Sequence, residues 1–221
     1  MLGRNQPDWS DVAEKYDGWY RTPRGLMYDT LEKGLLSALL EPAGSRRLLE
    51  IGCGTGHFTR WFEELGWRTW GLDREPAMLV RAGQRSSKKI VYCRGDAEQL
   101  PFADASFDVC ALITTLESTD RPVQALREAL RVSRRSVLLG VLNAVSLLAV
   151  QRRMRALFRP TIFSRTRFYS GPQMLALIRR AAAGMSLTVS VRFAIQRRCF
   201  FLRLPLGAFY ALRVDHQKRV V

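Results

Sequence analysis

Three glycines behind a short apolar run are the residues with the clearest chemical use in this sequence. The run ends at Glu50, and Gly52, Gly54 and Gly56 follow it. Glycine lets a ligand approach the backbone closely. A dinucleotide-binding fingerprint places its third glycine one position later, where this sequence has His57, and a phosphate-binding loop would end in lysine. The spacing therefore predicts a nucleotide-binding loop of neither of these two types.

Acidic residues end the next two apolar segments. Asp73 ends "WRTWGLD", at about the distance from the glycines where dinucleotide folds hold a ribose diol. Asp96 ends "VYCRGD" and can accept a hydrogen bond from an adenine amino group, with Leu100 and Phe102 as an apolar face for the ring. Taken singly, the glycines fit a tight turn, Asp73 fits a helix cap, and Asp96 fits a turn. Their order and spacing together favour a pocket for adenosine.

The elements that must position these residues alternate along the sequence. Segments of strand character are followed by segments of helical periodicity, many of which open with proline or close with glycine. We expect strands at 46–51, 67–73, 88–96, 107–114 and 135–142, and helices at 56–66, 75–84 and 121–133. This alternation predicts a parallel, doubly wound sheet. Ligands of such sheets bind beyond the carboxyl ends of the strands, where the glycines and both acids lie.

Further elements are expected on both sides of this core. Two N-terminal helices, at 8–22 and 26–40, are separated by Pro23, and a later helix is expected at 171–184. Two late strands, at 186–195 and within 197–213, would form an antiparallel hairpin. The predicted fold class is α/β, a doubly wound, mostly parallel seven-stranded sheet of Rossmann-like type with an antiparallel C-terminal hairpin. One domain would comprise a helical cap (1–45), a cofactor-binding core (46–142), and a basic helical lid with sheet completion (143–221).

The composition fits one globular domain with a strong basic excess. The chain has 221 residues, of which 47% are hydrophobic, and its formal charge is +15. Between residues 121 and 170 there are eleven arginines against one acid. Three interpretations remain open: a solvated basic face, a surface for anionic lipid or an acidic substrate, and a nucleic-acid surface. The last is disfavoured because zinc-finger and aromatic RNA-binding signatures are missing.

Cysteine and histidine usage argues against disulfides and metal sites. The four cysteines at 53, 93, 110 and 199 form no Cys-x-x-Cys pair, which favours buried free thiols in a reducing cytoplasm. With two histidines, a histidine-based metal site is not expected. The apolar run at 137–150 is too short to span a bilayer, and the first residues do not read as a signal peptide. We expect a cytoplasmic protein, with peripheral membrane contact through segment 143–170.

Four segments resemble a known family. "LLEIGCGTGHFTRWF", "GLDREPAML", "GDAEQLPFADASFDVCALITTLE" and "ALREALRVS" are similar to the class I S-adenosylmethionine-dependent methyltransferases, in the small-molecule branch that includes quinone-biosynthesis enzymes. The likeness covers roughly residues 46–142, and "AEKYDGWYRTPRG" resembles the cap of many relatives. Two departures stand out. "SRRSV" replaces the usual Pro-Gly-Gly, and "TTLESTD" lacks the histidines that often follow the fourth strand.

The resemblance implies S-adenosylmethionine as cofactor, S-adenosylhomocysteine as product, and a set of binding residues. The glycine-loop residues would line the methionine part, the residues from 73 to 78 would hold the ribose, and Asp96 and Ala97 would meet adenine. Thr114 would lie near the sulfonium, and Tyr20 near the cofactor's carboxylate. The full set is Tyr20, Glu50, Gly52, Cys53, Gly54, Gly56, Asp73, Arg74, Met78, Asp96, Ala97 and Thr114.

The chemistry needs few protein groups. Methyl transfer from a sulfonium depends on aligning the nucleophile, and a hydroxyl or carbon nucleophile also needs a general base. Glu117 is the candidate base by position, with a solvated loop acid as the alternative interpretation. His57 is expected to be a packing residue, and Cys53 is not expected to be a nucleophile.

The sequence therefore predicts a methyltransferase that acts on a small-molecule acceptor by in-line displacement. The acceptor would be anionic or lipid-like if segment 143–170 recognises it. A nicotinamide-dependent oxidoreductase is disfavoured by the glycine spacing. A cofactor-binding protein without catalysis stays open, because no catalytic base is obvious. An RNA methyltransferase is favoured only by charge, since "ITTLES" stands where many base-methylating enzymes have an Asn/Asp-Pro-Pro-Tyr motif.

Overall fold

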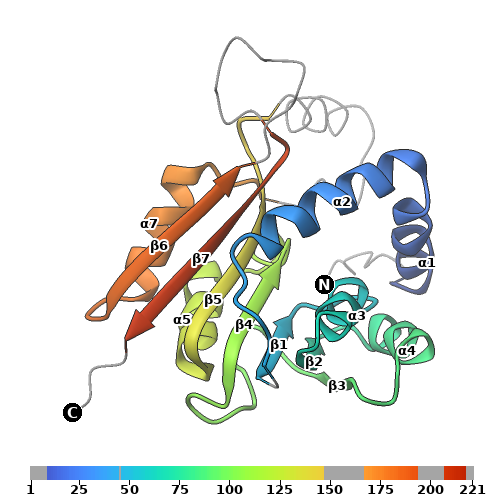
Figure 1. The fold of residues 1–221 in the computed structure, drawn as a ribbon, viewed down its shortest axis with the longest axis horizontal. Helices are drawn as coiled ribbons and strands as arrows, with labels where there is room; N and C mark the ends of the chain where they lie inside the picture. The colour runs from blue at the N-terminus through green and yellow to red at the C-terminus, as the bar shows by residue number, and fades with distance from the viewer. Residues whose placement is uncertain (1–8, 45, 147–166, 194–206, 218–221) are drawn as a thin grey trace, which may run out of the picture.

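A single twisted sheet organises the chain, with its strands in the order β3-β2-β1-β4-β5-β7-β6 (Figure 1). The computed structural model describes residues 9–44, 46–146, 167–193 and 207–217. Five neighbouring strands are parallel, and β7 runs antiparallel between β5 and β6. The strands are β1 (Arg47–Ile51), β2 (Arg68–Asp73), β3 (Val91–Arg94), β4 (Phe107–Ile113), β5 (Ser133–Leu142), β6 (Ser186–Phe193) and β7 (Phe209–Gln217).

Helices cover both faces of this sheet. They are α1 (Trp9–Tyr20), α2 (Pro23–Ser37), α3 (His57–Glu64), α4 (Pro76–Arg85), α5 (Pro122–Val132) and α7 (Gly171–Ala181). One apolar cluster joins α5 and α7 to the sheet, and a second joins α2 and α3 to it. None of the helices in the described ranges is long and apolar enough to cross a membrane.

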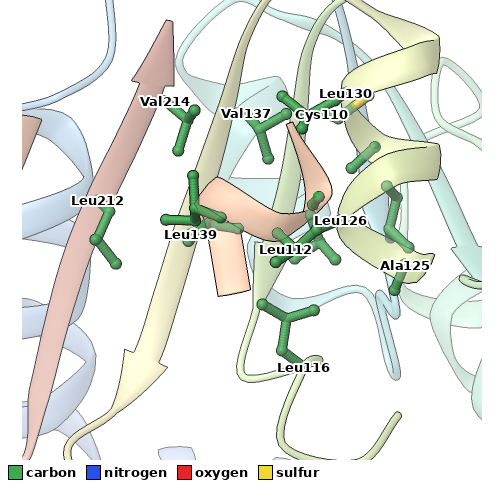
Figure 2. Close-up of a cluster of buried hydrophobic side chains, with 14 of the residues drawn as sticks. Cys110, Leu112, Leu116, Ala125, Leu126, Leu130, Val137, Leu139, Leu212 and Val214 are labelled. Carbon is green, nitrogen blue, oxygen red and sulfur yellow. The ribbon is translucent and has the colours of Figure 1, made fainter. Parts of the chain in front are cut away.

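The central strands are apolar on both sides because both faces are covered. Successive side chains of a strand point to opposite faces, so Leu48 enters the cluster of α2 and α3 while Leu49 enters the cluster of α5 and α7. In the cluster of α5 and α7, Leu126 of α5 lies beside Leu112 of β4, and Leu130, one helical turn further along α5, lies beside Cys110 (Figure 2). Packing on both faces fixes the carboxyl ends of β1 and β4 relative to each other.

The predicted fold class is confirmed, including the antiparallel hairpin of β6 and β7. Several boundaries differ from the expected ones, three of them for a clear physical reason or by the largest amount. Strand β3 is limited to Val91–Arg94, shorter than the expected 88–96, and it lies at the sheet edge. Strand β7 begins after Pro205 and extends beyond the expected range to Gln217. Pro23 opens α2 instead of only ending α1, because proline's missing N–H is not needed at a first helical position.

Most of the expected basic lid falls outside the described residues. Residues 143–146 form a turn after β5, and the description resumes at Arg167. Five of the six arginines that the sequence assigns to the lid lie in the undescribed range 147–166, as Arg152, Arg153, Arg155, Arg159 and Arg165. The fourth cysteine, Cys199, also lies outside the described part of the chain.

Candidate functional site

The glycine loop combines two internal contacts with one open position. All three glycines have positive φ, +72° at Gly52, +52° at Gly54 and +74° at Gly56. A Cβ at Gly52 would lie 2.3 Å from the Thr115 side chain, and one at Gly56 would lie 2.3 Å from the Tyr92 hydroxyl. A Cβ at Gly54 would meet no atom within 4 Å. Packing therefore requires the outer glycines, and Gly54 is where the loop faces open space.

Asp73 lies directly against this loop. One carboxylate oxygen accepts the Gly54 N–H at 2.8 Å, and the other accepts the Glu75 N–H at 2.9 Å. Burial raises the pKa of Asp73, and the two backbone N–H groups oppose that rise. Each carboxylate oxygen retains a second acceptor site. The residue at the N-cap of α4 is Glu75, so Asp73 is not simply the helix cap.

Asp96 begins a turn after β3. Its Oδ1 accepts the Glu98 N–H at 2.8 Å, and its carbonyl accepts the Gln99 N–H at 3.1 Å. The side chain is exposed and Ala97 is half-buried. Phe102, from the same loop, packs edge-on against Phe107, with 5.0 Å between ring centroids. Asp96 therefore lies in a turn, which confirms the interpretation as a turn residue. Its second carboxylate oxygen can still accept a hydrogen bond from a ligand.

The end of β4 is strained and tied to the glycine loop. Thr114 has φ +52°, a left-handed conformation that is costly for a β-branched residue. Its N–H donates to the Gly140 carbonyl at 2.8 Å, which holds it in place. The neighbouring hydroxyl of Thr115 donates to the Ile51 carbonyl at 2.9 Å. Strain of this kind, held at the carboxyl end of a central strand, is typical of functional sites.

Glu50 is a buried acid just before the glycine loop. Its side chain is 2% exposed, and Oε2 accepts a hydrogen bond from the Thr59 hydroxyl on α3. Burial raises the pKa of Glu50 to about 8. Glu50 therefore holds its proton at neutral pH until a cation comes close to it.

Glu117 is buried as well, which contradicts the interpretation as a solvated loop acid. The residue is 1% exposed, and its Oε1 accepts the Leu142 N–H at 2.7 Å. No residue in the described ranges donates a hydrogen bond to Oε2. Burial raises the pKa of Glu117 to about 7. An acid with this pKa and a free oxygen can accept a proton near neutral pH.

The N-terminal helices pack onto the start of α3. The Tyr20 ring stacks on the His57 ring, with centroids 3.9 Å apart, and His57 Nε2 lies 2.7 Å from an Asp29 oxygen. The expectation that His57 is a packing residue is confirmed. The Thr55 hydroxyl of the glycine loop donates to Asp17 of α1 at 2.7 Å. Sequence analysis missed Asp17, because the two residues are 38 positions apart and no local pattern links them.

The remaining predicted residues differ in what their side chains offer. Cys53 is 5% exposed, and its sulfur lies against Gly71 of β2, so only its backbone is available at the loop. Met78 is buried in the first turn of α4. The Arg74 side chain is more than half exposed and pairs with Glu75 at 3.4 Å. The structure therefore brings the backbone of the glycine loop together with Asp73, Glu50 and the end of β4.

Comparison with known proteins adds a matching domain model and similar sequences to this geometry. Residues 49–139 match the model of a methyltransferase domain. The malonyl-acyl-carrier protein O-methyltransferase of Serratia marcescens is 37% identical over 117 residues, 53% of this chain and 45% of that protein. The ubiquinone/menaquinone biosynthesis C-methyltransferase of Roseobacter denitrificans is 32% identical over 146 residues, 60% of this chain and 55% of that protein. The chain thus spans about half the length of these curated relatives.

A solved structure extends the likeness to nearly the whole fold. It is an S-adenosylmethionine-dependent methyltransferase of Thermotoga maritima, described as a possible histamine N-methyltransferase. The TM-score is 0.72 at 24% identity, and the match covers 95% of this chain and 98% of that chain. At this identity the likeness shows the fold, which is the Rossmann-like fold of methyltransferases.

Proposed function

We propose that this chain is a class I S-adenosylmethionine-dependent methyltransferase that methylates a small-molecule acceptor, because residues 49–139 match a methyltransferase domain and the similar proteins are named as methyltransferases. The observation that carries the proposal is the Asp73 carboxylate, held against the one glycine of the loop that faces open space. Such a carboxylate suits a ribose diol, and such a glycine suits a ligand that touches backbone.

The other residues of the site suit the remaining parts of the cofactor. Asp96 and Ala97 would receive the adenine, and Glu50 offers its buried carboxyl to the cofactor's amino group. Tyr20 and the backbone of the glycine loop would close around the methionine part. Bound S-adenosylmethionine supplies a methyl group made electrophilic by the positive sulfur. Thr114 would lie close to that sulfur, and the enzyme's main task is to align the acceptor and exclude water.

Glu117 is the proposed general base. Its Oε2 has no partner within the described ranges, and its raised pKa of about 7 allows it to take a proton from a hydroxyl or carbon acid. The Leu142 N–H fixes the other oxygen, so the carboxyl group has a defined orientation. These observations favour catalysis over cofactor binding alone.

Two observations bear on the acceptor: the names of the similar proteins and the arginines of segment 143–170. By their names, one of the relatives given above methylates malonyl-acyl-carrier protein and the other acts in ubiquinone/menaquinone biosynthesis. An anionic or lipid-like acceptor would suit the arginines of segment 143–170, and peripheral contact with an anionic membrane would suit them too. Liposome flotation at low salt, with and without anionic lipid, tests the membrane contact. A cytoplasmic location is part of the same proposal.

Isothermal titration calorimetry with three ligands tests the proposed function. We expect S-adenosylmethionine and S-adenosylhomocysteine each to bind with one site per chain. The dinucleotide NAD should give no heat under the same conditions, because the glycine spacing does not match its fingerprint. Binding of NAD without binding of the two adenosyl ligands would reverse the assignment.

Alanine at two glycines of the loop should separate folding from binding. At Gly54 the new methyl group enters open space, so we expect a stability loss of about 1–2 kcal/mol from the positive φ. S-adenosylhomocysteine should bind at least about 10-fold more weakly, since the methyl group occupies ligand space. At Gly52 the clash with Thr115 adds to the strain, so we expect a larger loss, about 3 kcal/mol or more. Urea denaturation and calorimetry measure both effects. Equal stability losses in the two variants would contradict this account of the loop.

Cofactor binding should release a proton from Glu50. The free protein holds this carboxyl protonated at pH 7, because burial raises its pKa to about 8. The cofactor's ammonium group favours the ionised carboxylate, so binding lowers that pKa and strengthens as pH rises from 6 to 8. Calorimetry in buffers of different ionisation enthalpy measures the protons released. Glu50→Gln keeps an acceptor for Thr59 and should abolish the release, and a wild-type protein that releases no proton would contradict this role.

A further inference from the structure

One arginine of α5, Arg131, has every donor engaged, and three of its hydrogen bonds reach the loop between β3 and β4. Arg131 donates from Nε and from one terminal nitrogen to the two oxygens of Glu128, both at 2.8 Å. The other terminal nitrogen donates to the Phe102 carbonyl and to Asp104, both at 2.8 Å. A fifth bond reaches the Leu100 carbonyl at 3.1 Å. Five bonds equal the full number of guanidinium N–H groups.

Glu128 and Arg131 also accept hydrogen bonds from backbone N–H groups of the loop. Glu128 accepts the Leu100 N–H at 2.8 Å, and the Arg131 carbonyl accepts the Ala105 N–H at 3.0 Å. Ala105 has φ +52°, so the loop turns sharply at this contact. Arg131 and Glu128 thus bind backbone groups at both ends of the segment from Leu100 to Ala105.

This contact differs from an ordinary surface ion pair. The Arg131 side chain is 32% exposed and the Glu128 side chain 13%, and their contact is bidentate. Bidentate pairs of this kind fix geometry as well as adding energy. The pair Arg121 and Glu98 holds the start of the loop, but Arg121 is 73% exposed and its contribution is correspondingly weaker.

Beyond the turn at Asp96 and the contacts of Glu98 with Arg121, the loop has no helix or strand of its own to set its shape. Residues 96–106 belong to no strand and no helix, so they lack the ladder bonds that fix the neighbouring strands. Yet this loop carries Asp96 and Ala97, which the proposed function assigns to adenine, and the buried Leu100. Leu100 joins the two features directly, because its backbone binds both Glu128 and Arg131 while its side chain enters the core.

We propose that Arg131 and Glu128 are positioning residues for base recognition, which hold loop 96–105 in the shape that accepts adenine. The inference rests on the proposed function. The two residues would act on the cofactor through the loop, without contacting it. Their effect should fall on the affinity for the adenosyl ligand and on the discrimination between bases.

Competition between two ligands tests this role. S-adenosylhomocysteine carries the adenine amino group, and S-inosylhomocysteine replaces it with an oxygen. We expect Arg131→Met and Glu128→Gln to weaken binding of the first ligand by 10-fold or more and to bring the two affinities closer together. Arg131→Lys keeps the positive charge but lacks the planar guanidinium that forms several hydrogen bonds at once, so it should recover only part of the lost affinity. Arg127→Met is the matched control, because its guanidinium reaches the Arg180 carbonyl at 3.5 Å and not the loop.

Amide hydrogen exchange provides a second measurement that needs no ligand. Exchange at residues 97–105 should accelerate in Arg131→Met and Glu128→Gln and stay unchanged in Arg127→Met. Should Arg131→Met fail to fold, Glu128→Gln retains the arginine's contacts with the carbonyls and decides the question. Variants that lose thermal stability but keep wild-type affinity and base preference would overturn the inference alone. A wild-type protein that binds neither adenosyl ligand would overturn the proposed function as well.

Discussion

Asp73→Ala is expected to weaken binding of S-adenosylhomocysteine by at least about 100-fold. Two hydrogen bonds from the ribose to a charged carboxylate are lost, at about 1.5–3 kcal/mol each, and 1.4 kcal/mol corresponds to a factor of ten. The substitution also frees the Gly54 and Glu75 N–H groups that the carboxylate now accepts. Calorimetric titration of the wild-type protein and the variant measures the difference.

Asp108 provides a matched control for this result. Its carboxylate also accepts a backbone N–H, from Arg47 at 3.0 Å, but it lies at the amino ends of β1 and β4, away from the glycine loop. Asp108→Ala should therefore lower stability while leaving the affinity for S-adenosylhomocysteine unchanged. If both variants lose affinity equally, general destabilisation explains the effect and the ribose assignment fails.

Glu117→Gln is expected to remove a loss of stability that the wild-type protein shows as pH rises. Burial raises the pKa of Glu117 from 4.5 in the unfolded chain to about 7 in the folded protein. The folded state therefore binds more protons between these values, and wild-type stability falls as pH rises through that window. By pH 8 the ionised carboxylate should cost about 3 kcal/mol, at 1.36 kcal/mol per pKa unit. Glutamine keeps an acceptor for the Leu142 N–H and avoids this cost.

Urea denaturation at pH 5 and pH 8 measures the difference, and Glu41→Gln serves as a control of opposite sign. Hydrogen bonds from Arg46 and Arg213 lower the pKa of Glu41 to about 2, so its stabilisation is present above 4.5 and lost on acidification towards 2. Glu41→Gln should thus be less stable than the wild type at neutral pH, and Glu117→Gln more stable at pH 8. A Glu117→Gln variant that gains nothing between pH 5 and 8 would contradict a buried, ionising carboxyl.

Methyltransferase activity provides a second measurement on Glu117→Gln. A general base typically contributes about 10²–10⁴ to the rate. Once labelled S-adenosylmethionine has identified an acceptor in a metabolite extract, Glu117→Gln should lower kcat by about that factor with the affinity for S-adenosylhomocysteine retained. An unchanged kcat would leave Glu117 as an anchor for the end of β5.

The sequence predicts the fold class because its signals are local. Each parallel strand is a short apolar segment, and helices such as α4 and α5 begin at a proline, so order and type follow from neighbouring residues. The boundaries of β3 and β7 are less predictable, because a strand ends where its pairing with neighbouring strands ends and not where its own residues change. Asp73 and the glycine loop could be found for the same local reason, since strand ends and turn glycines are readable in sequence.

The contacts that shape the site are long-range and could not be predicted. Thr115, which follows β4, packs against Gly52 although the two residues are 63 positions apart in the sequence. Three of the five bonds of Arg131 reach a loop about 30 positions earlier, and "ALREALRVS" alone reads as an amphipathic helix. The burial of Glu117 is a further case, because it depends on the end of β5 and on Arg167, whose N–H donates to the Glu117 carbonyl at 2.9 Å.

A structure of the protein crystallised with S-adenosylhomocysteine tests the central claim most directly. The account predicts that the ribose hydroxyls contact the Asp73 carboxylate, that the ligand passes Gly54, and that adenine lies in the loop that begins at Asp96. A ligand bound elsewhere on the sheet, or a ribose turned away from Asp73, would contradict it.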